Sequence, residues 1–221
     1  MGLDITVVMA DWERLARIPA GERLVVLTDA VHPYFCCESC EDADSAVQGG
    51  WVWQRQSPWC AEYRFFGTTG SYSWHFHLAN AWEGVRASVV PDLREALDRF
   101  LGGLVWDGPD YGSAAGEDDG YPSAGGFPDD PGPWCPRVLL LRAPGEVPAL
   151  VRDWRTAEPR LEELREPFDA QAQAQAQAEN EADGRATRSG RFDEAVALLR
   201  EWGEVVTGAG ERGWGLIGLP Y

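Results

Sequence analysis

The segment AEYRFFGTTGSYSWHFHL, residues 61–78, decides how the first half of the chain is interpreted. Apolar and polar residues alternate from Ala61 to Phe66 and again from Tyr72 to Leu78, with a glycine-bounded connection between the two runs. Such alternation is typical of a half-buried strand, and two runs joined in this way are typical of a hairpin. The sequence therefore predicts an aromatic-rich antiparallel hairpin.

One face of this predicted hairpin is polar. When the aromatic positions are paired across the two strands, Arg64 lies opposite His75 and Glu62 opposite His77. A carboxylate beside a histidine raises its pKa and selects its tautomer, which acid–base catalysis or metal binding requires. If the protein is an enzyme, these four residues are the candidate catalytic set, with the histidines as metal ligands, Glu62 as base and Arg64 as an anion clamp. The alternative interpretation is an inert, solvated sheet face.

Outside the hairpin, strands are predicted mainly in the first half of the chain and helices mainly in the second. Further strands are expected at 4–9, 51–53, 137–142 and 214–219. Helices are expected at 11–18, 80–89, 91–102, 147–156 and 191–206, and another from Pro159 onward. Residues 21–31 fit a helix or a strand and favour the helix, and the Ala/Gln run at 170–178 is a solvated helix extension or a linker. This order favours an α+β fold, a small and mostly antiparallel sheet packed by helices that come mainly from the second half. The length of 221 residues suits a single domain. Two segments are interpreted as insertions, an acidic Gly/Pro-rich loop at 103–136 and a low-complexity Ala/Gln segment at 169–190.

The charge balance is strongly acidic, with a formal net charge of −17, and the chain contains no lysine. Without lysine, Schiff-base chemistry and lysine-dependent phosphate loops are excluded. An acidic surface repels phosphate backbones and anionic lipids, so we expect neither nucleic acid nor membrane as a partner. A basic protein partner is favoured instead. The predicted partner-binding residues lie in two arginine-free segments and are Glu38, Glu41, Asp42, Asp118 and Asp119.

The cysteines suggest a zinc site. Cys37-x-x-Cys40 has the spacing of half a tetrahedral zinc centre, and Cys60 and His77 are the candidates to complete it if the fold brings them together. Zinc is therefore the one cofactor that the sequence suggests. The alternatives are buried core thiols or a redox pair.

The sequence also carries indications of source and compartment. An excess of Ala, Gly, Arg and Pro without lysine is typical of a GC-rich bacterial genome. No apolar run reaches the length of a membrane span, and the N-terminus lacks signal-peptide features, so we expect a cytoplasmic protein.

Two functional hypotheses follow from these patterns. The first is a non-catalytic acidic protein that binds a basic partner, with an antitoxin or immunity-like role as its concrete form. The alternative is a metal-dependent hydrolase that uses the polar face around His75 and His77.

Overall fold

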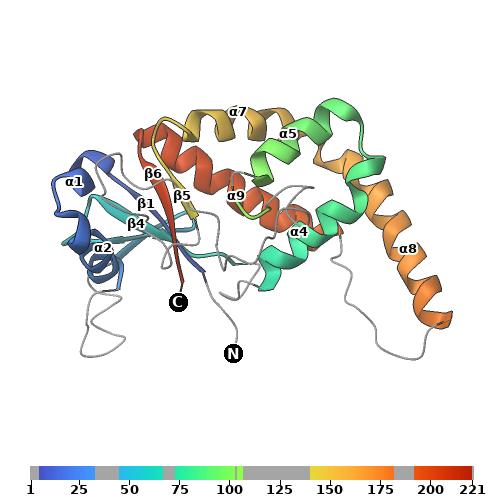
Figure 1. Cartoon of the computed structure of the whole chain (residues 1–221), viewed down its shortest axis with the longest axis horizontal. Coiled ribbons are helices and arrows are strands. Elements are labelled where there is room, and N and C mark those ends of the chain that lie inside the picture. The colour runs from blue at the N-terminus through green and yellow to red at the C-terminus, as the bar shows by residue number, and fades with distance from the viewer. Residues whose placement is uncertain are drawn as a thin grey trace. The chain divides into compact units, whose positions relative to one another are not determined.

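The computed structural model describes residues 5–32, 45–66, 73–102, 104–106, 140–181 and 192–220 (Figure 1). The chain divides into two compact units. The first, here called the sheet unit, comprises Met1–Ser71, Asp118–Pro148 and Glu204–Tyr221. The second, the helical unit, comprises Tyr72–Glu117 and Ala149–Gly203. The single-domain organisation expected from the length, with its two insertions, stays a prediction.

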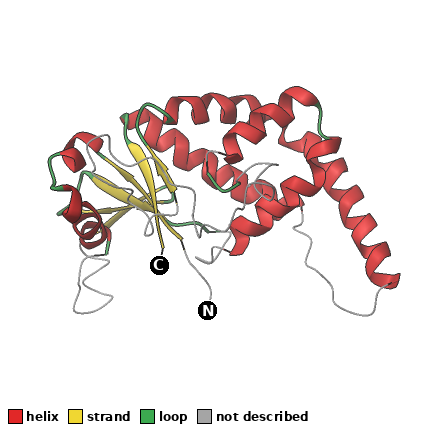
Figure 2. Ribbon diagram, in the orientation of Figure 1, coloured by secondary structure: helices red, strands yellow, loops and turns green. Residues whose placement is uncertain are grey.

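The sheet unit contains one antiparallel sheet, drawn in yellow in Figure 2. Its strands are β1 (Ile5–Ala10), β2 (Ser45–Gln48), β3 (Trp51–Gln54), β4 (Cys60–Tyr63), β5 (Leu140–Arg142) and β6 (Gly215–Pro220). Their order in the sheet is β2-β3-β4-β1-β6-β5. Strand β1 is apolar except for Thr6 and every one of its residues is buried, as a central strand covered on both faces requires. The predicted α+β class and the mostly antiparallel sheet are therefore confirmed.

One face of the sheet is covered by two helices from the first half of the chain. They are α1 (Trp12–Ala16) and α2 (Arg23–Val31), separated by the short 3₁₀ helix η1 (Ala20–Glu22). Asp11 caps α1 by accepting a hydrogen bond from the main-chain nitrogen of Arg14 over 3.2 Å. Side chains from both helices pack with the strands in one buried cluster that includes Val8, Leu15, Leu27, Trp59 and Ile217.

The opposite face of the sheet carries aromatic side chains. Trp51 on β3 lies opposite Tyr63 on β4, and their rings meet edge to face at 5.1 Å. Helix α9 (Phe192–Arg212) contributes its last turns to this unit, and Gly208 allows close packing because a Cβ atom there would lie 2.8 Å from Trp51 Nε1. An aromatic-rich hairpin therefore exists, and β3 and β4 form it.

The predicted second strand of that hairpin, Tyr72–Leu78, is wrong. Its residues begin helix α4 (Ser73–Val85), so the helix predicted at 80–89 starts earlier and ends earlier than expected. The buried side chains of α4 recur at helical spacing, at Leu78, Ala81, Trp82 and Val85. The aromatic residue Phe76 is instead 53% exposed. The alternation of apolar and polar residues before Leu78 therefore did not predict which side chains are buried.

The helical unit contains α4 and the elements η2 (Arg86–Ser88), α5 (Pro91–Gly102), α7 (Val147–Ala157), η3 (Glu158–Leu164), α8 (Arg165–Glu181) and the first part of α9. Its core is rich in tryptophan, and the rings of Phe100 and Trp154 stack at 5.3 Å. Asp98 ties α4 to α5 by accepting hydrogen bonds from Trp82 Nε1 at 3.0 Å and Arg86 Nε at 2.7 Å. In the described part of the chain, none of the helices has both the length and the apolar character of a membrane-spanning helix.

Candidate acidic interface

The negative charge of the described residues is concentrated on the helical unit. The described residues of this unit include fifteen carboxylates and eight arginines, which gives a formal charge of −7. The described residues of the sheet unit include eight carboxylates and seven arginines, which gives a formal charge of −1. A surface that attracts a basic partner is therefore better sought on the helical unit.

A row of polar side chains follows η3 and α8 along one side. Glu162, Glu166, Asp169 and Gln173 succeed one another at spacings of four, three and four residues, and all four are exposed. Residues at these spacings lie on one face of a helix. We call these four residues the acidic stripe. Together with Glu163, Arg165 and Ala170 they line an open cleft of about 520 Å³.

An apolar face on the same segment keeps the acidic stripe exposed to solvent. Leu161, Leu164 and Phe168 are all buried and recur at spacings of three and four residues. Burying a side chain of this size stabilises a fold by about 1.5–3 kcal/mol, so this apolar face determines how the segment packs. The carboxylates between these positions are consequently left in solvent.

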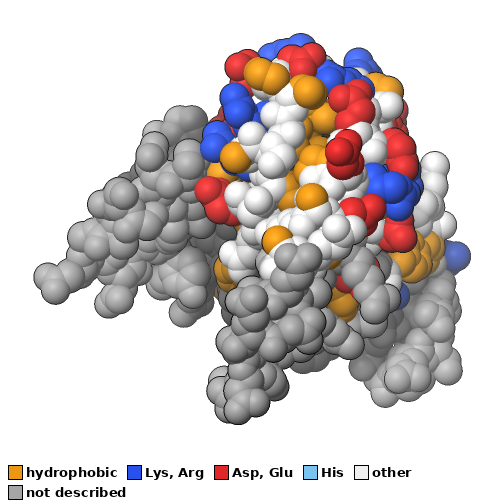
Figure 3. Space-filling view, turned by 90° about the vertical axis from the view of Figure 1, so that its right-hand side faces the viewer, with side chains coloured by type: hydrophobic (Ala, Val, Ile, Leu, Met, Phe, Trp, Pro, Cys, Tyr) orange, Lys and Arg blue, Asp and Glu red, His pale blue; other side chains and the backbone are white. Residues whose placement is uncertain are grey.

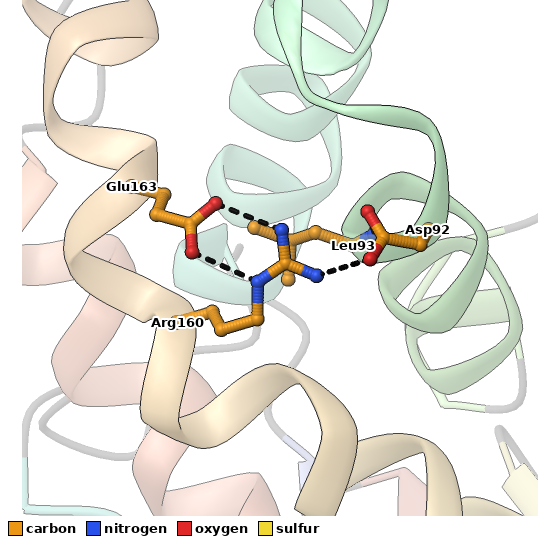
Figure 4. A network of polar contacts seen from close by, with 4 residues as sticks. All are labelled: Asp92, Leu93, Arg160 and Glu163. Atoms are coloured by element: carbon orange, nitrogen blue, oxygen red, sulfur yellow. Dashed lines mark hydrogen bonds and ion pairs between the residues drawn. The ribbon is translucent and has the colours of Figure 1, made fainter.

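Arg160 on η3 is bound by two carboxylates (Figure 4). Its Nη1 donates to Asp92 Oδ2 on α5 over 2.6 Å, while Nε and Nη2 donate to the two oxygens of Glu163 over 2.8 and 2.9 Å. Hydrogen bonds from the guanidinium lower the pKa of both Asp92 and Glu163, and the main-chain nitrogen of Leu93 lowers that of Asp92 further. The two carboxylates in turn raise the pKa of Arg160.

Arg165, at the start of α8, is held in a similar way. It donates hydrogen bonds to Glu162, which lower the pKa of that carboxyl. Its Nη1 lies 3.7 Å from Asp193 Oδ1, and its guanidinium lies 4.1 Å from the ring centroid of Phe192. The basic side chains of this segment are therefore occupied by partners within the protein.

Two carboxylates of the stripe are not held in an internal ion pair. Within the residues that the structure describes, no arginine lies within ion-pair distance of Glu166 or Asp169, although Arg165 attracts Asp169 electrostatically. From Glu158 to Asp169 the chain carries five carboxylates and two arginines, so the segment stays negative after pairing. On the face drawn in Figure 3, acidic and basic side chains lie beside one another around hydrophobic side chains. On such a mixed surface, the carboxylates without an internal partner are the ones available to a ligand.

The partner-binding residues predicted from sequence cannot be placed on this surface. Glu38, Glu41, Asp42, Asp118 and Asp119 lie outside the described residues, as do the predicted metal ligands Cys37 and Cys40. Their assignment stays a prediction. The acidic stripe was missed because the segment from Pro159 onward was predicted only as a helix, and the spacing of its carboxylates was not considered. The spacing of its carboxylates was the available signal.

The register that placed Glu62 and Arg64 opposite the two histidines does not exist, because α4 replaces the predicted strand. Glu62 and Arg64 belong to the sheet unit, whereas His75 and His77 belong to the helical unit. On a helix, residues two apart point to different sides. His75 is 1% exposed, whereas His77 is exposed, so the helix does not present them as a pair. Burial lowers the pKa of His75 to about 4, and its ring meets that of Trp202 edge to face at 5.6 Å.

Cys60 is a buried thiol of the sheet unit. Its Sγ lies 3.8 Å from the carbonyl oxygen of Ser57, to which it donates, and burial raises its pKa to about 12. Zinc binds the thiolate, so the position disfavours the required form of the side chain. Among the described residues, no three His, Cys, Asp or Glu side chains gather in a way that could hold a metal ion. The zinc site stays a prediction that depends on Cys37 and Cys40.

No protein-family model, curated protein or solved structure matches this chain.

Proposed function

We propose that this protein is a non-catalytic binder of a basic protein partner, and that the acidic stripe forms part of the contact surface. The observation that carries the proposal is that Glu166 and Asp169 are exposed and lie outside the ion pairs of the acidic stripe, on the unit where the described negative charge is concentrated. Complementary charge accelerates association and selects partners of the opposite sign. An antitoxin or immunity-like protein that neutralises a basic toxin is the concrete form of this proposal.

The internal ion pairs support this interpretation in a second way. Because Asp92 and Glu163 both bind Arg160, the guanidinium is not available to repel a basic partner. Arg165 is likewise oriented by Glu162 and Asp193. Side chains that are already ordered lose less conformational entropy when a partner docks beside them. The partner's lysines and arginines would then meet Glu166 and Asp169.

The metal-dependent hydrolase alternative depended on the hairpin register that α4 replaces. No arrangement of the described residues favours it over the binding function, so we do not pursue it as a second candidate.

The experiment compares three tagged proteins in affinity capture from cell extract. The stripe variant carries Glu162→Gln, Glu166→Gln and Asp169→Asn. The control variant carries the same three types of change at exposed carboxylates of the sheet unit, Glu22→Gln, Glu211→Gln and Asp29→Asn. Both variants therefore change the net charge equally.

Quantitative mass spectrometry of the captured proteins gives the result. We expect a lysine- and arginine-rich protein to be captured by the wild type and the control, and about tenfold less by the stripe variant. High salt should release it from the wild type. Equal capture by all three proteins, or captured proteins without a basic surface, would remove the support for this function.

A further inference from the structure

The sheet unit carries a second cleft, which is separate from the acidic stripe. It is an open surface cleft of about 570 Å³, lined by Ala46, Gln48, Trp53, Pro58, Arg212 and Trp214. The indole rings of Trp53 and Trp214 lie 6.0 Å apart and are tilted by 54°. Pockets that hold small ligands commonly have this size, with aromatic walls and a few polar groups that orient the ligand.

The small side chain of Ala46 leaves room above Trp53. Ala46 lies on β2, which is an edge strand of the sheet, and the β2–β3 register places it directly opposite Trp53. Because side chains on paired strands point to the same face at opposed positions, a large residue at 46 would fill the space beside the indole. The register therefore keeps one side of the Trp53 ring accessible.

The turn that ends α9 positions the other two cleft residues. Gly213 has φ +65°, which is the left-handed conformation that glycine adopts without strain. The main-chain nitrogen of Trp214 donates to the carbonyl of Ala209 over 3.0 Å, and that of Gly213 donates to Gly210 over 3.2 Å. These two bonds form a Schellman motif, with Arg212 as the last helical residue. The motif fixes the main chain from which the side chains of Arg212 and Trp214 extend.

Arg212 supplies a cation at this cleft. Its guanidinium carbon lies 4.7 Å from the ring centroid of Trp53, and the side chain is exposed. Its one hydrogen bond within the described residues is a long one of 3.5 Å to the carbonyl of Gly208, and no described carboxylate pairs with it. A guanidinium stacked on an indole keeps its N–H groups directed outward, where they can bind a carboxylate.

We infer that this cleft binds an aromatic carboxylate, with the ring of the ligand against Trp53 and Trp214 and its carboxylate on Arg212. A planar ring can stack on the face of one indole and contact the edge of the other, as aromatic groups prefer. Two sources carry this chemistry, a free aromatic acid and the C-terminal aromatic residue of a peptide. The inference is independent of the acidic stripe, since every lining residue belongs to the sheet unit.

The test uses N-acetyl-L-phenylalanine as the probe and N-acetyl-L-phenylalaninamide as a probe that lacks only the charge. Binding is followed by NMR of the indole N–H signals, with those of Trp53 and Trp214 assigned through Trp53→Phe and Trp214→Phe. The carboxylate probe should shift both signals and bind about tenfold more tightly than the amide, because a charge-assisted hydrogen bond is lost in the amide. Unshifted Trp53 and Trp214 signals at millimolar probe, or equal binding of the two probes, would overturn the inference.

Two arginine variants locate the carboxylate site. Arg212→Gln should reduce binding of the carboxylate probe to the level of the amide. Arg14→Gln is the matched control, because Arg14 also lies over an indole, that of Trp59 at 5.4 Å, away from the cleft. An equal loss in both variants would contradict the assignment to Arg212. If Arg212→Gln does not fold, the comparison of the acid and amide probes on the wild type still decides whether the cleft binds the carboxylate.

The source of the ligand is resolved by a third probe, acetyl-Ala-Ala-Phe with a free C-terminus. Binding about tenfold tighter than that of N-acetyl-L-phenylalanine supports a peptide C-terminus, because the added main chain contributes contacts. Equal binding of the two supports a free aromatic acid.

Discussion

Arg23 donates a hydrogen bond from Nε to the carbonyl oxygen of Leu15 over 3.0 Å, and the residue is only 2% exposed. The same side chain reaches the carbonyls of Ile18 at 2.9 Å and Ala16 at 3.3 Å. It therefore donates to main-chain carbonyls at and just beyond the end of α1, where no further helical turn supplies N–H donors. A charged side chain is thus a structural part of the sheet unit.

Replacing this arginine should destabilise the fold. In Arg23→Met, buried carbonyls lose a charged donor, and we expect the free energy of unfolding to fall by about 3 kcal/mol. Arg17→Met is the control, because Arg17 is 78% exposed and only pairs with Glu13 at 3.8 Å. Its effect should stay below about 0.5 kcal/mol. Urea unfolding measures both, and equal midpoints for the two variants would contradict the role assigned to Arg23.

The burial of His75 predicts a pH-dependent stability. Its pKa is about 4 in the folded protein against 6.5 for the unperturbed group, so the unfolded chain binds the proton more readily. Stability is therefore complete above the unfolded pKa and is lost as the pH falls from 6.5 toward 4. From pH 7.5 to 5.5 the loss should be about 1.3 kcal/mol.

Urea unfolding at these two pH values tests this linkage. In His75→Phe, which keeps an aromatic ring beside Trp202, the dependence should disappear. His77→Gln should retain it, because His77 is exposed. A wild-type protein whose unfolding free energy is unchanged between the two values would show that His75 does not titrate in this way.

The ion pairs of Arg160 predict a measurable change in carboxyl titration. Arg160→Gln should raise the pKa of Asp92 and Glu163, because the guanidinium lowers both. The stabilisation these pairs give is present above the unfolded carboxyl pKa and is lost as the pH falls through the lower folded values. Carboxyl-carbon NMR titration of wild type and variant measures the shift. Identical titration curves would mean that the contacts of Figure 4 do not persist in solution.

The sheet could largely be predicted from the sequence, but its hairpin partners could not. Strand β1 is apolar at five of its six positions, and strands were correctly expected at 51–53 and around Tyr63. The alternation at Tyr72–Leu78 misled because a seven-residue window also fits the first turns of a helix. Extending the window to Trp82 and Val85 shows the helical period.

The candidate sites were only partly accessible from the sequence. The spacing of Glu162, Glu166 and Asp169 is local, so a helical-face analysis could have found the acidic stripe. The contact between Arg160 and Asp92 spans 68 residues, and no local pattern predicts it. The same holds for the ring contact between Trp53 and Trp214, which depends on sheet order and on the turn after α9.

The central claim is that carboxylates of the acidic stripe bind a basic partner. The most direct measurement is the dissociation constant of the purified captured partner at low and high salt, for wild type, stripe variant and control variant. We predict that the stripe variant binds about tenfold more weakly at low salt and depends less on salt, while the control matches the wild type. Equal affinity and equal salt dependence in all three proteins would contradict the claim.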